Sequence, residues 1–334
     1  MSSTTPFWKG WLIDMGNYGG QRRFSRRQFV RLVMAAGLGT TLASCGDGEP
    51  QPSPQAVRET ASPTAGQAYL AVARGQDPKA VARAALASIG GIGRFVKSGD
   101  DVIVKPNICV DYRPYEYGAT TNPEVVATLV ELCLGVGARR VRVMDQPFAG
   151  GPESAYVTSG IADAVRVAGG EMEVMNQAKF RKTDIPEGRD LTSCRVYQEL
   201  LTADVVINVP VAKHHSLARL SLGGKNLFGV VENPSLMHAN LGQRTADLVS
   251  LVRPTLTVVD AMRTLMTHGP TGGNLSDVRI TNTVIASHDI VAADAYAATL
   301  FGLKGEDISY VKAAAEMGLG TLDLESIKLE EIEV

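Results

Sequence analysis

Short apolar runs rich in β-branched residues alternate with helical segments along most of this chain. This alternation is typical of a parallel sheet whose strands are buried on both faces by helices. Strands are expected at 69–73, 101–104, 140–144, 172–175, 204–209, 256–259, 284–287 and 327–334. Helices are expected at 80–89, 121–135, 154–168 and 290–301, with one more before the last strand, whereas 178–196 is expected to be irregular. The pattern predicts an α/β fold with a mainly parallel sheet, built as one domain or as two lobes.

Proline and capping residues mark two of the helix starts. Asp77-Pro78 precedes the first helix, and Asn122-Pro123 precedes the second. An Asp or Asn side chain can accept a hydrogen bond from a free N–H of the first turn, and proline suits the first helical position because it has no N–H to satisfy. These positions therefore predict where both helices begin.

Polar residues follow four of the predicted strands, at the point where each strand ends. In a parallel α/β sheet, ligands bind beyond the carboxyl ends of the strands. The four segments are Lys105-Pro106-Asn107, Asp145-Gln146-Pro147, Lys213-His214-His215, and Asp260 followed by His268-Gly269-Pro270. The sequence therefore predicts that these groups converge on one edge of the sheet.

The stretch 204–231 contains the densest part of this candidate site. Its strand stops at Pro210, which cannot donate to a sheet ladder, and Gly223-Gly224-Lys225-Asn226 follows within an apolar context. We expect ligand binding by Lys105, Asn107, Gly223, Gly224, Lys225 and Asn226, and catalytic roles for Lys213, His214, Asp260 and His268. The alternative is a structural turn with cations on the surface, which is the usual place for lysine and histidine.

The charge balance of this cluster favours a small anionic ligand. Three ammonium groups and glycine-exposed N–H groups face a single strand-end carboxylate, and such donors suit a carboxylate or a phosphate. His214 or His268 would carry a proton, because imidazole titrates near neutral pH. Neighbouring residues of an extended chain point to opposite sides, so at most one of His214 and His215 faces the site.

A metal ion is a second candidate ligand, because imidazole and carboxylate together suit zinc, nickel or iron. The candidate ligands are His214, His238, His268 and Asp294. Cys109, Cys133 and Cys194 are isolated in the sequence, so an iron–sulfur cluster within the chain is not expected, and each cysteine is expected to be a core residue. The chain has no G-x-x-x-x-G-K-[ST], H-E-x-x-H or G-x-S-x-G motif, which lowers the weight of the common nucleotide-binding and hydrolase classes.

The first 45 residues have the features of a targeting segment. Ser25-Arg26-Arg27-Gln28-Phe29-Val30 matches the twin-arginine export pattern, and the weakly apolar run 32–43 follows it. Leu42-Ala43-Ser44-Cys45 resembles a lipobox, which predicts lipidation of Cys45 and attachment to the outer face of the cell membrane. The alternative is an N-terminal hydrophobic anchor with an incidental cysteine. Residues 46–67, rich in Pro and Ser, are expected to be a disordered tether before a domain at 68–334.

Charge argues against a nucleic-acid partner. The chain has 33 basic and 35 acidic residues, and six of the basic ones but one of the acidic ones lie in the first 45 residues. The remainder is therefore acidic, with no basic run that could neutralise phosphates.

Several motifs together resemble the family known as domain of unknown function 362. They are V-K-P-N, K-H-H after V-P, G-G-K-N-L-F-G, V-V-D-A-M, H-G-P and A-A-D-A, spread over 102–320. Many members of that family carry a ferredoxin-like four-cysteine module, which this chain lacks. A more distant similarity to the nickel-pincer lactate racemase group implies an α/β enzyme that acts on a small hydroxy acid.

Two hypotheses about function follow. The first is a cell-surface enzyme that binds a small anionic molecule or a metal cofactor at the strand-end cluster. The second is a lipid-anchored accessory protein that captures a ligand or cofactor for a redox partner. Histidine and aspartate beside lysine provide acid/base capacity that simple capture does not need, which favours the enzyme.

Overall fold

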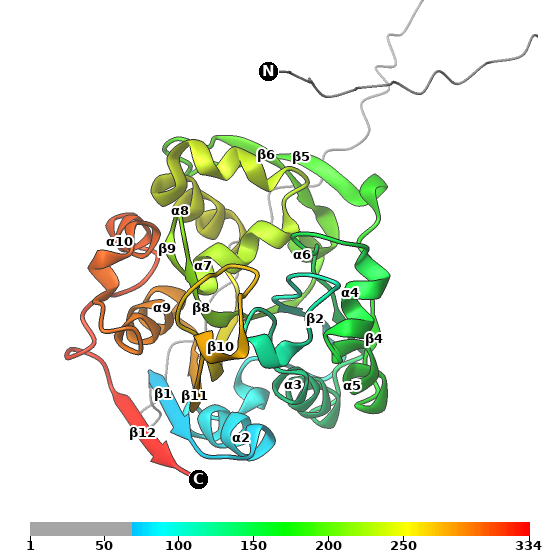
Figure 1. Ribbon diagram of the computed structural model, residues 1–334. Helices are drawn as coiled ribbons and strands as arrows, with labels where there is room; N and C mark the ends of the chain where they lie inside the picture. Colours follow the sequence, from blue (N-terminus) through cyan, green and yellow to red (C-terminus); the bar gives the residue numbers. More distant parts are fainter. Residues whose placement is uncertain (1–68) are drawn as a thin grey trace, which may run out of the picture. The chain divides into compact units, whose positions relative to one another are not determined.

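Within residues 69–334, which the computed structural model describes, ten strands form one sheet in the order β12-β1-β11-β10-β7-β2-β3-β4, with β8 and β9 attached beside β10 (Figure 1). The strands are β1 (Leu70–Arg74), β2 (Asp101–Pro106), β3 (Arg140–Val143), β4 (Glu171–Met172), β7 (Val205–Val209), β8 (Val211–His215), β9 (Arg219–Ser221), β10 (Leu256–Leu265), β11 (Val278–Ser287) and β12 (Leu329–Glu333). Six of the nine strand pairings are parallel, which confirms the predicted sheet.

The helices connect these strands and cover the sheet. They are α2 (Pro78–Ser88), α3 (Pro123–Gly135), α4 (Pro152–Thr158), α5 (Ile161–Val167), α6 (Gln198–Thr202), α7 (Gly223–Asn226), α8 (Leu241–Val252), α9 (Ile290–Thr299) and α10 (Ser309–Glu316). The side chains of Asp77 and Asn122 accept hydrogen bonds from the first turns of α2 and α3, and proline stands at the start of each helix. The two predicted helix starts are therefore confirmed.

Both faces of the sheet are apolar because alternate residues of the central strands enter two different cores. Val102 and Val104 of β2 pack in one core together with α2, α3 and α5. Ile103, between them, belongs to the other core, to which α8, α9 and α10 contribute. Figure 1 shows these two groups of helices on either side of the strands. Helices from both halves of the chain pack on the same sheet, so residues 69–334 form one unit and not two lobes.

Several segments differ from the sequence-based expectation. The stretch 178–196, expected to be irregular, contains an antiparallel hairpin of β5 (Phe180–Asp184) and β6 (Ser193–Tyr197). Lysine and arginine on the exposed side of the hairpin mask the alternation of apolar and polar residues in the sequence. On the buried side, the ring centroids of Phe180 and Tyr197 lie 5.2 Å apart. The predicted helix 154–168 is divided into α4 and α5 at Gly160, whose φ of 76° is left-handed. Helix α8 was not anticipated.

The N-terminal predictions lie outside the described residues. They are the targeting segment 1–45 with its lipidation site Cys45, and the tether 46–67. Among residues 69–334, none of the helices combines the length and the apolar character that crossing a membrane requires.

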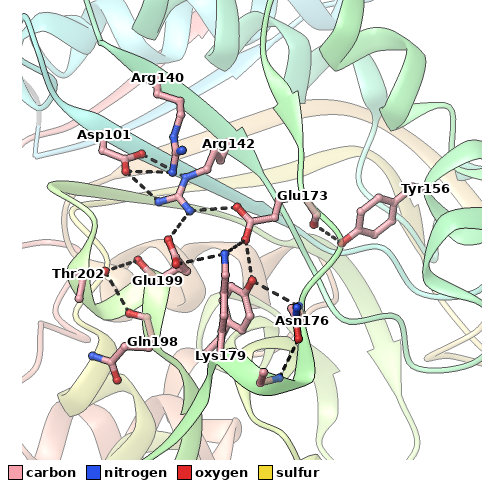
Figure 2. A network of polar contacts seen from close by, with 12 residues as sticks. Asp101, Arg140, Arg142, Tyr156, Glu173, Asn176, Lys179, Gln198, Glu199 and Thr202 are labelled. Carbon is pink, nitrogen blue, oxygen red and sulfur yellow. Dashed lines mark hydrogen bonds and ion pairs between the residues drawn. The ribbon is translucent and has the colours of Figure 1, made fainter. Parts of the chain in front are cut away.

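A buried arginine holds β2, β3 and α6 together at the edge of the sheet opposite the strand ends discussed above. Arg142 on β3 is 2% exposed, and its guanidinium donates to Asp101 at 2.9 and 3.2 Å, to Glu173 at 3.0 Å and to Glu199 at 2.7 Å (Figure 2). Burial alone would lower the pKa of Arg142, but these hydrogen bonds raise it. The guanidinium therefore stays charged and binds three separate segments.

Two further cations balance the charge of this cluster. Lys179 pairs with Glu173 at 3.0 Å and with Glu199 at 3.2 Å, and Arg140 pairs with Asp101 at 3.3 Å. Three cations thus face three carboxylates. Burial would raise the pKa of Glu173, but hydrogen bonds from Tyr197, Lys179 and Arg142 lower it. Its stabilising contribution is present above the ordinary pKa of a glutamate and is lost as the pH falls through the lowered value.

Replacing Arg142 with Met should lower the free energy of unfolding by about 3 kcal/mol, because the carboxylates around it lose their shared partner. Urea denaturation measures this change. The matched control is Arg166→Met. Arg166 pairs with Asp163 at the surface, where the two side chains are 74% and 83% exposed, so this substitution should change stability by less than about 0.5 kcal/mol. Equal effects of the two substitutions would contradict a structural role for the buried cluster.

Candidate functional site

A pocket of about 260 Å³ lies beyond the carboxyl ends of β2, β3 and β7. Asn107 follows β2, Asp145 follows β3 and Pro210 follows β7, so three neighbouring parallel strands supply one wall. Other parts of the lining come from the stretch 221–229 and from the 3-10 helix η5 (Pro234–Asn240). The polar side chains that line the pocket are Asn107, Cys109, Asp145, Gln146, Lys213, His215, Ser221, Lys225, Asn226, Ser235 and His238.

A buried ion pair forms the floor of the pocket. Lys105 at the end of β2 and Asp145 after β3 lie 2.6 Å apart, with side chains 0% and 3% exposed. Asp145 also accepts the Ile108 N–H at 2.7 Å, and Lys105 donates to the Pro106 carbonyl at 3.0 Å. Burial raises the pKa of Asp145 and lowers that of Lys105, so each charge depends on the other. Lys105 does not line the pocket, and its predicted role in ligand binding is corrected to support of the floor.

Gly229 is required by the close approach of the chain to this ion pair. A Cβ atom at this position would overlap the Oδ1 atom of Asp145 and come within 2.9 Å of the Lys105 Nζ. The last glycine of the G-G-K-N-L-F-G motif is therefore explained by packing against the floor and not by a turn.

The amide of Asn226 connects the floor to the pocket wall. Its Nδ2 donates to the Asn208 Oδ1 at 2.8 Å and to the Lys105 carbonyl at 3.2 Å, and its Oδ1 accepts from the Asn107 Nδ2 at 3.0 Å. Asn107 in turn accepts from the Lys213 Nζ at 2.9 Å. The buried Asn226 thus holds Asn107, and through it Lys213, in a fixed position.

Lys213 has one donor left for a ligand. It is 2% exposed, and its Nζ donates to the Asn107 Oδ1 and to the Ala119 carbonyl at 2.6 Å. An ammonium group has three N–H donors, so the third is available on the pocket side.

Lys225 differs from the other two lysines of the cluster. Among residues 69–334, no hydrogen-bond acceptor or carboxylate contacts its ammonium group, whose Nζ lies 4.4 Å from the centre of the Phe228 ring. Burial lowers the pKa of Lys225 to about 8, and the nearby positive charge of Lys213 acts in the same direction. The amine therefore lies close to its titration point at neutral pH.

His215, and not His214, is the histidine of β8 that lines the pocket. Its Nδ1 accepts the backbone N–H groups of Leu217 and Ala218 at 3.1 and 3.3 Å, so its proton is carried on Nε2. Burial lowers the pKa of His215 to about 3, and the charges of Lys225 and Lys213 add to the shift. His215 is thus a neutral hydrogen-bond donor.

The other three histidine and aspartate residues predicted to be catalytic lie outside the pocket lining. His214 points to the other side of β8, where its Nδ1 accepts the Gly269 N–H at 3.2 Å. His268 is 70% exposed and lies 3.0 Å from Asp277. Asp260 accepts the N–H groups of Asn122 and Met262, and burial raises its pKa to about 6. Asp260 therefore organises the start of α3 and does not contact a ligand.

The two glycines predicted to offer N–H groups to a ligand are also committed elsewhere. Gly223 and Gly224 donate to the two carboxylate oxygens of Asp294 on α9, at 2.6 and 2.9 Å. Burial raises the pKa of Asp294 to about 7, although both hydrogen bonds oppose the shift. Asp294 thus anchors α7 and is not available as a metal ligand.

The candidate metal ligands do not come together. Across the described part of the chain, no three His, Cys, Asp or Glu side chains are grouped so that they could hold a metal ion. His238 lines the pocket, whereas His214, His268 and Asp294 have the separate partners given above. The structure therefore does not support the predicted metal site.

Of the predicted binding and catalytic residues, the structure brings Asn107, Lys213, Lys225 and Asn226 together. Sequence reasoning missed His215 and Cys109. The alternation of a strand contained the signal for His215, because residues 213 and 215 of an extended segment point to the same side. Cys109 is buried as expected, but its thiol also faces the pocket.

Replacing Gly229 with Ala should lower the free energy of unfolding by about 1–3 kcal/mol, because the new methyl group displaces the Lys105–Asp145 pair. The control is Gly135→Ala at the end of α3, where a Cβ meets no atom within 4 Å and should leave stability equal or raise it by up to about 1 kcal/mol. Urea denaturation of both variants tests this. An unchanged free energy of unfolding in Gly229→Ala would contradict a tight fit between Gly229 and the Lys105–Asp145 pair.

The thylakoid-associated protein sll1697 of Synechocystis sp. is 29% identical over 254 residues, which are 71% of this chain and 74% of the relative. The lactate racemase apoprotein from Thermoanaerobacterium thermosaccharolyticum matches with a TM-score of 0.43 and 10% identity, over 66% of this chain and 54% of the other, so that this chain spans about half of its length. Residues 102–299 match the family described as domain of unknown function (DUF362), and the chain belongs to that family.

Proposed function

We propose that the strand-end pocket binds a small anionic molecule. The observation that carries this proposal is the excess of donors. Lys213, Lys225 and the Nε2–H of His215 face the pocket, whereas Asp145, the one acidic side chain among its described lining residues, is committed to Lys105. Removing an ammonium group from water costs free energy, and a bound anion offsets part of that cost.

The size of the pocket favours a small ligand. Pockets for drug-sized molecules span about 300–1,000 Å³, and this one has about 260 Å³. A small carboxylate or phosphate fits a site of this size and pairs with both lysines.

An enzyme is favoured over a passive binding protein because one group in the pocket titrates near neutral pH. His214 and His268, the proton carriers expected from the sequence, do not line the pocket. Lys225 replaces them in this proposal, since a pKa of about 8 suits transfer of a proton at physiological pH.

Replacing Lys225 with Met should weaken the binding of acetate or inorganic phosphate by about tenfold to a hundredfold, the loss expected for a charged hydrogen bond. Methionine keeps the apolar stem on Phe228, so stability should change by no more than about 1 kcal/mol. Titration calorimetry gives the affinity and urea denaturation the stability. The control is Lys312→Met on the exposed side of α10, which should leave affinity unchanged.

The pH dependence of acetate binding extends this test. Lys225 attracts an anion while it is protonated, so affinity should be highest below about pH 8 and fall as the pH rises through that value. Bound acetate stabilises the ammonium form and moves the midpoint upward. Lys225→Met should lose this step. An unfolded Lys225→Met protein would instead favour a structural role for the Gly-Lys-Asn turn.

We further propose that the protein is exported by the twin-arginine route and held on the outer face of the cell membrane by a lipid on Cys45. The support is the sequence of residues 25–45, and the relative from Synechocystis is named as thylakoid-associated, which agrees with attachment to a membrane. The tether 46–67 would then hold the pocket-bearing domain away from the bilayer.

Replacing Cys45 with Ala should block lipidation and release the protein from the membrane fraction or leave it unprocessed. Fractionation and the mass of the mature protein measure this. Replacing Arg26 and Arg27 with Lys should stop export, and replacing Arg22 and Arg23, which lie outside the motif, is the matched control. Unchanged retention and mass in the Cys45 variant would contradict the proposed anchor.

A further inference from the structure

Lys225, which is half-buried, differs in its contacts from the two buried lysines near this pocket, Lys105 and Lys213. The Nζ of Lys105 lies 2.6 Å from Asp145, and that of Lys213 donates to an amide and a carbonyl. Both ammonium groups therefore have hydrogen-bond acceptors. Lys225 lies on the Phe228 ring at the pocket wall, where none of the described residues accepts a hydrogen bond from it.

We propose that Lys225 forms an imine with the carbonyl carbon of a small oxo acid, whose carboxylate binds to Lys213 and to the Nε2–H of His215. This inference rests on the anion site proposed above and names its substrate class. Lys213 and His215 alternate on the same side of β8, so both donors can reach one carboxylate. The carbonyl group of the same molecule then faces the wall that holds Lys225.

The covalent step requires no oxidant or reductant. The neutral nitrogen of Lys225 attacks the carbonyl carbon, and a C–N bond forms while the carbonyl electrons move to oxygen. Transfer of a proton from nitrogen to oxygen gives a carbinolamine. The C–O bond then breaks, the oxygen leaves as water after taking a second proton from the solvent, and the protonated imine remains. One water is released for each C=N bond formed.

The environment supplies the neutral amine that this step needs. Burial and the charge of Lys213 lower the pKa of Lys225 to about 8, so a larger share of this amine is neutral at pH 7 than of an ordinary lysine. His238 lines the same pocket, and burial and the charge of Lys225 lower its pKa below the ordinary value. The His238 ring packs edge-on against the Phe228 ring, with 6.3 Å between the ring centroids, so it lies beside the ring on which Lys225 rests.

Reductive trapping tests the inference. The full-length protein is incubated with pyruvate and sodium cyanoborohydride, and the adduct is mapped by peptide mass spectrometry. A single adduct on Lys225 is expected, heavier than the free lysine by the mass of pyruvate less one oxygen atom. Acetate, which has the carboxylate but no carbonyl, should compete with trapping. Acetone, which has the carbonyl but no carboxylate, should give at least tenfold less adduct.

Two variants separate the amine from its charge. Lys225→Arg keeps the positive charge, and with it part of the acetate binding, but it cannot form an imine and should give no adduct. Lys225→Met should lose both properties. Mapping of the natural protein needs no variant, so a folding defect in either one leaves the inference testable.

The outcomes distinguish this inference from the function proposed above. Acetate binding without an adduct on Lys225 overturns the imine and leaves the anion site in place. If the protein neither binds acetate nor forms the adduct, both the anion site and the imine are overturned. An adduct shared equally with exposed lysines such as Lys304 and Lys312, or one that persists in Lys225→Arg, reflects nonspecific reaction and also overturns the inference.

Discussion

The ion pair between Lys105 and Asp145 is the constraint on which the rest of the site depends. It joins the ends of two adjacent strands at the bottom of the pocket, where the two side chains are almost fully buried. Gly229 is needed because no side chain fits against the pair, and the Asn226 amide bonds to the backbone of Lys105 and to Asn107. A substitution that moves Lys105 or Asp145 is therefore expected to move Asn107 at the pocket wall as well, because Asn226 is hydrogen-bonded to both sides.

The sheet carries two groups of charges, and they differ in balance. Around Arg142, three cations meet three carboxylates and every charge has a partner, as a purely structural cluster requires (Figure 2). At the pocket, the ammonium group of Lys225 remains without an acceptor among the described residues. A charge without an acceptor lowers the stability of the fold, and such a charge is typical of a functional site, where a ligand can pair with it. The unpaired charge of Lys225 therefore favours a functional role for the pocket.

Local signals in the sequence were reliable where the cause of structure is local. Proline and a capping side chain determine the starts of α2 and α3 within a few residues, and the β-branched runs give the central strands. The hairpin of β5 and β6 was missed because its exposed residues are charged and its buried ones pack on distant elements. Strand β8 was missed because Pro210 ends β7 only one residue before β8 begins.

By itself, the sequence determined the α/β class and the edge of the sheet where Asn107, Lys213, Lys225 and Asn226 meet, because the carboxyl ends of parallel strands lie together. Only the tertiary structure decided which polar groups are free. Lys105 is neutralised by a residue 40 positions away, and the N–H groups of Gly223 and Gly224 are occupied by Asp294, about 70 positions on. Partners so distant in the chain leave no local pattern, so the availability of a charge depends on the folded packing and not on the motif that contains it.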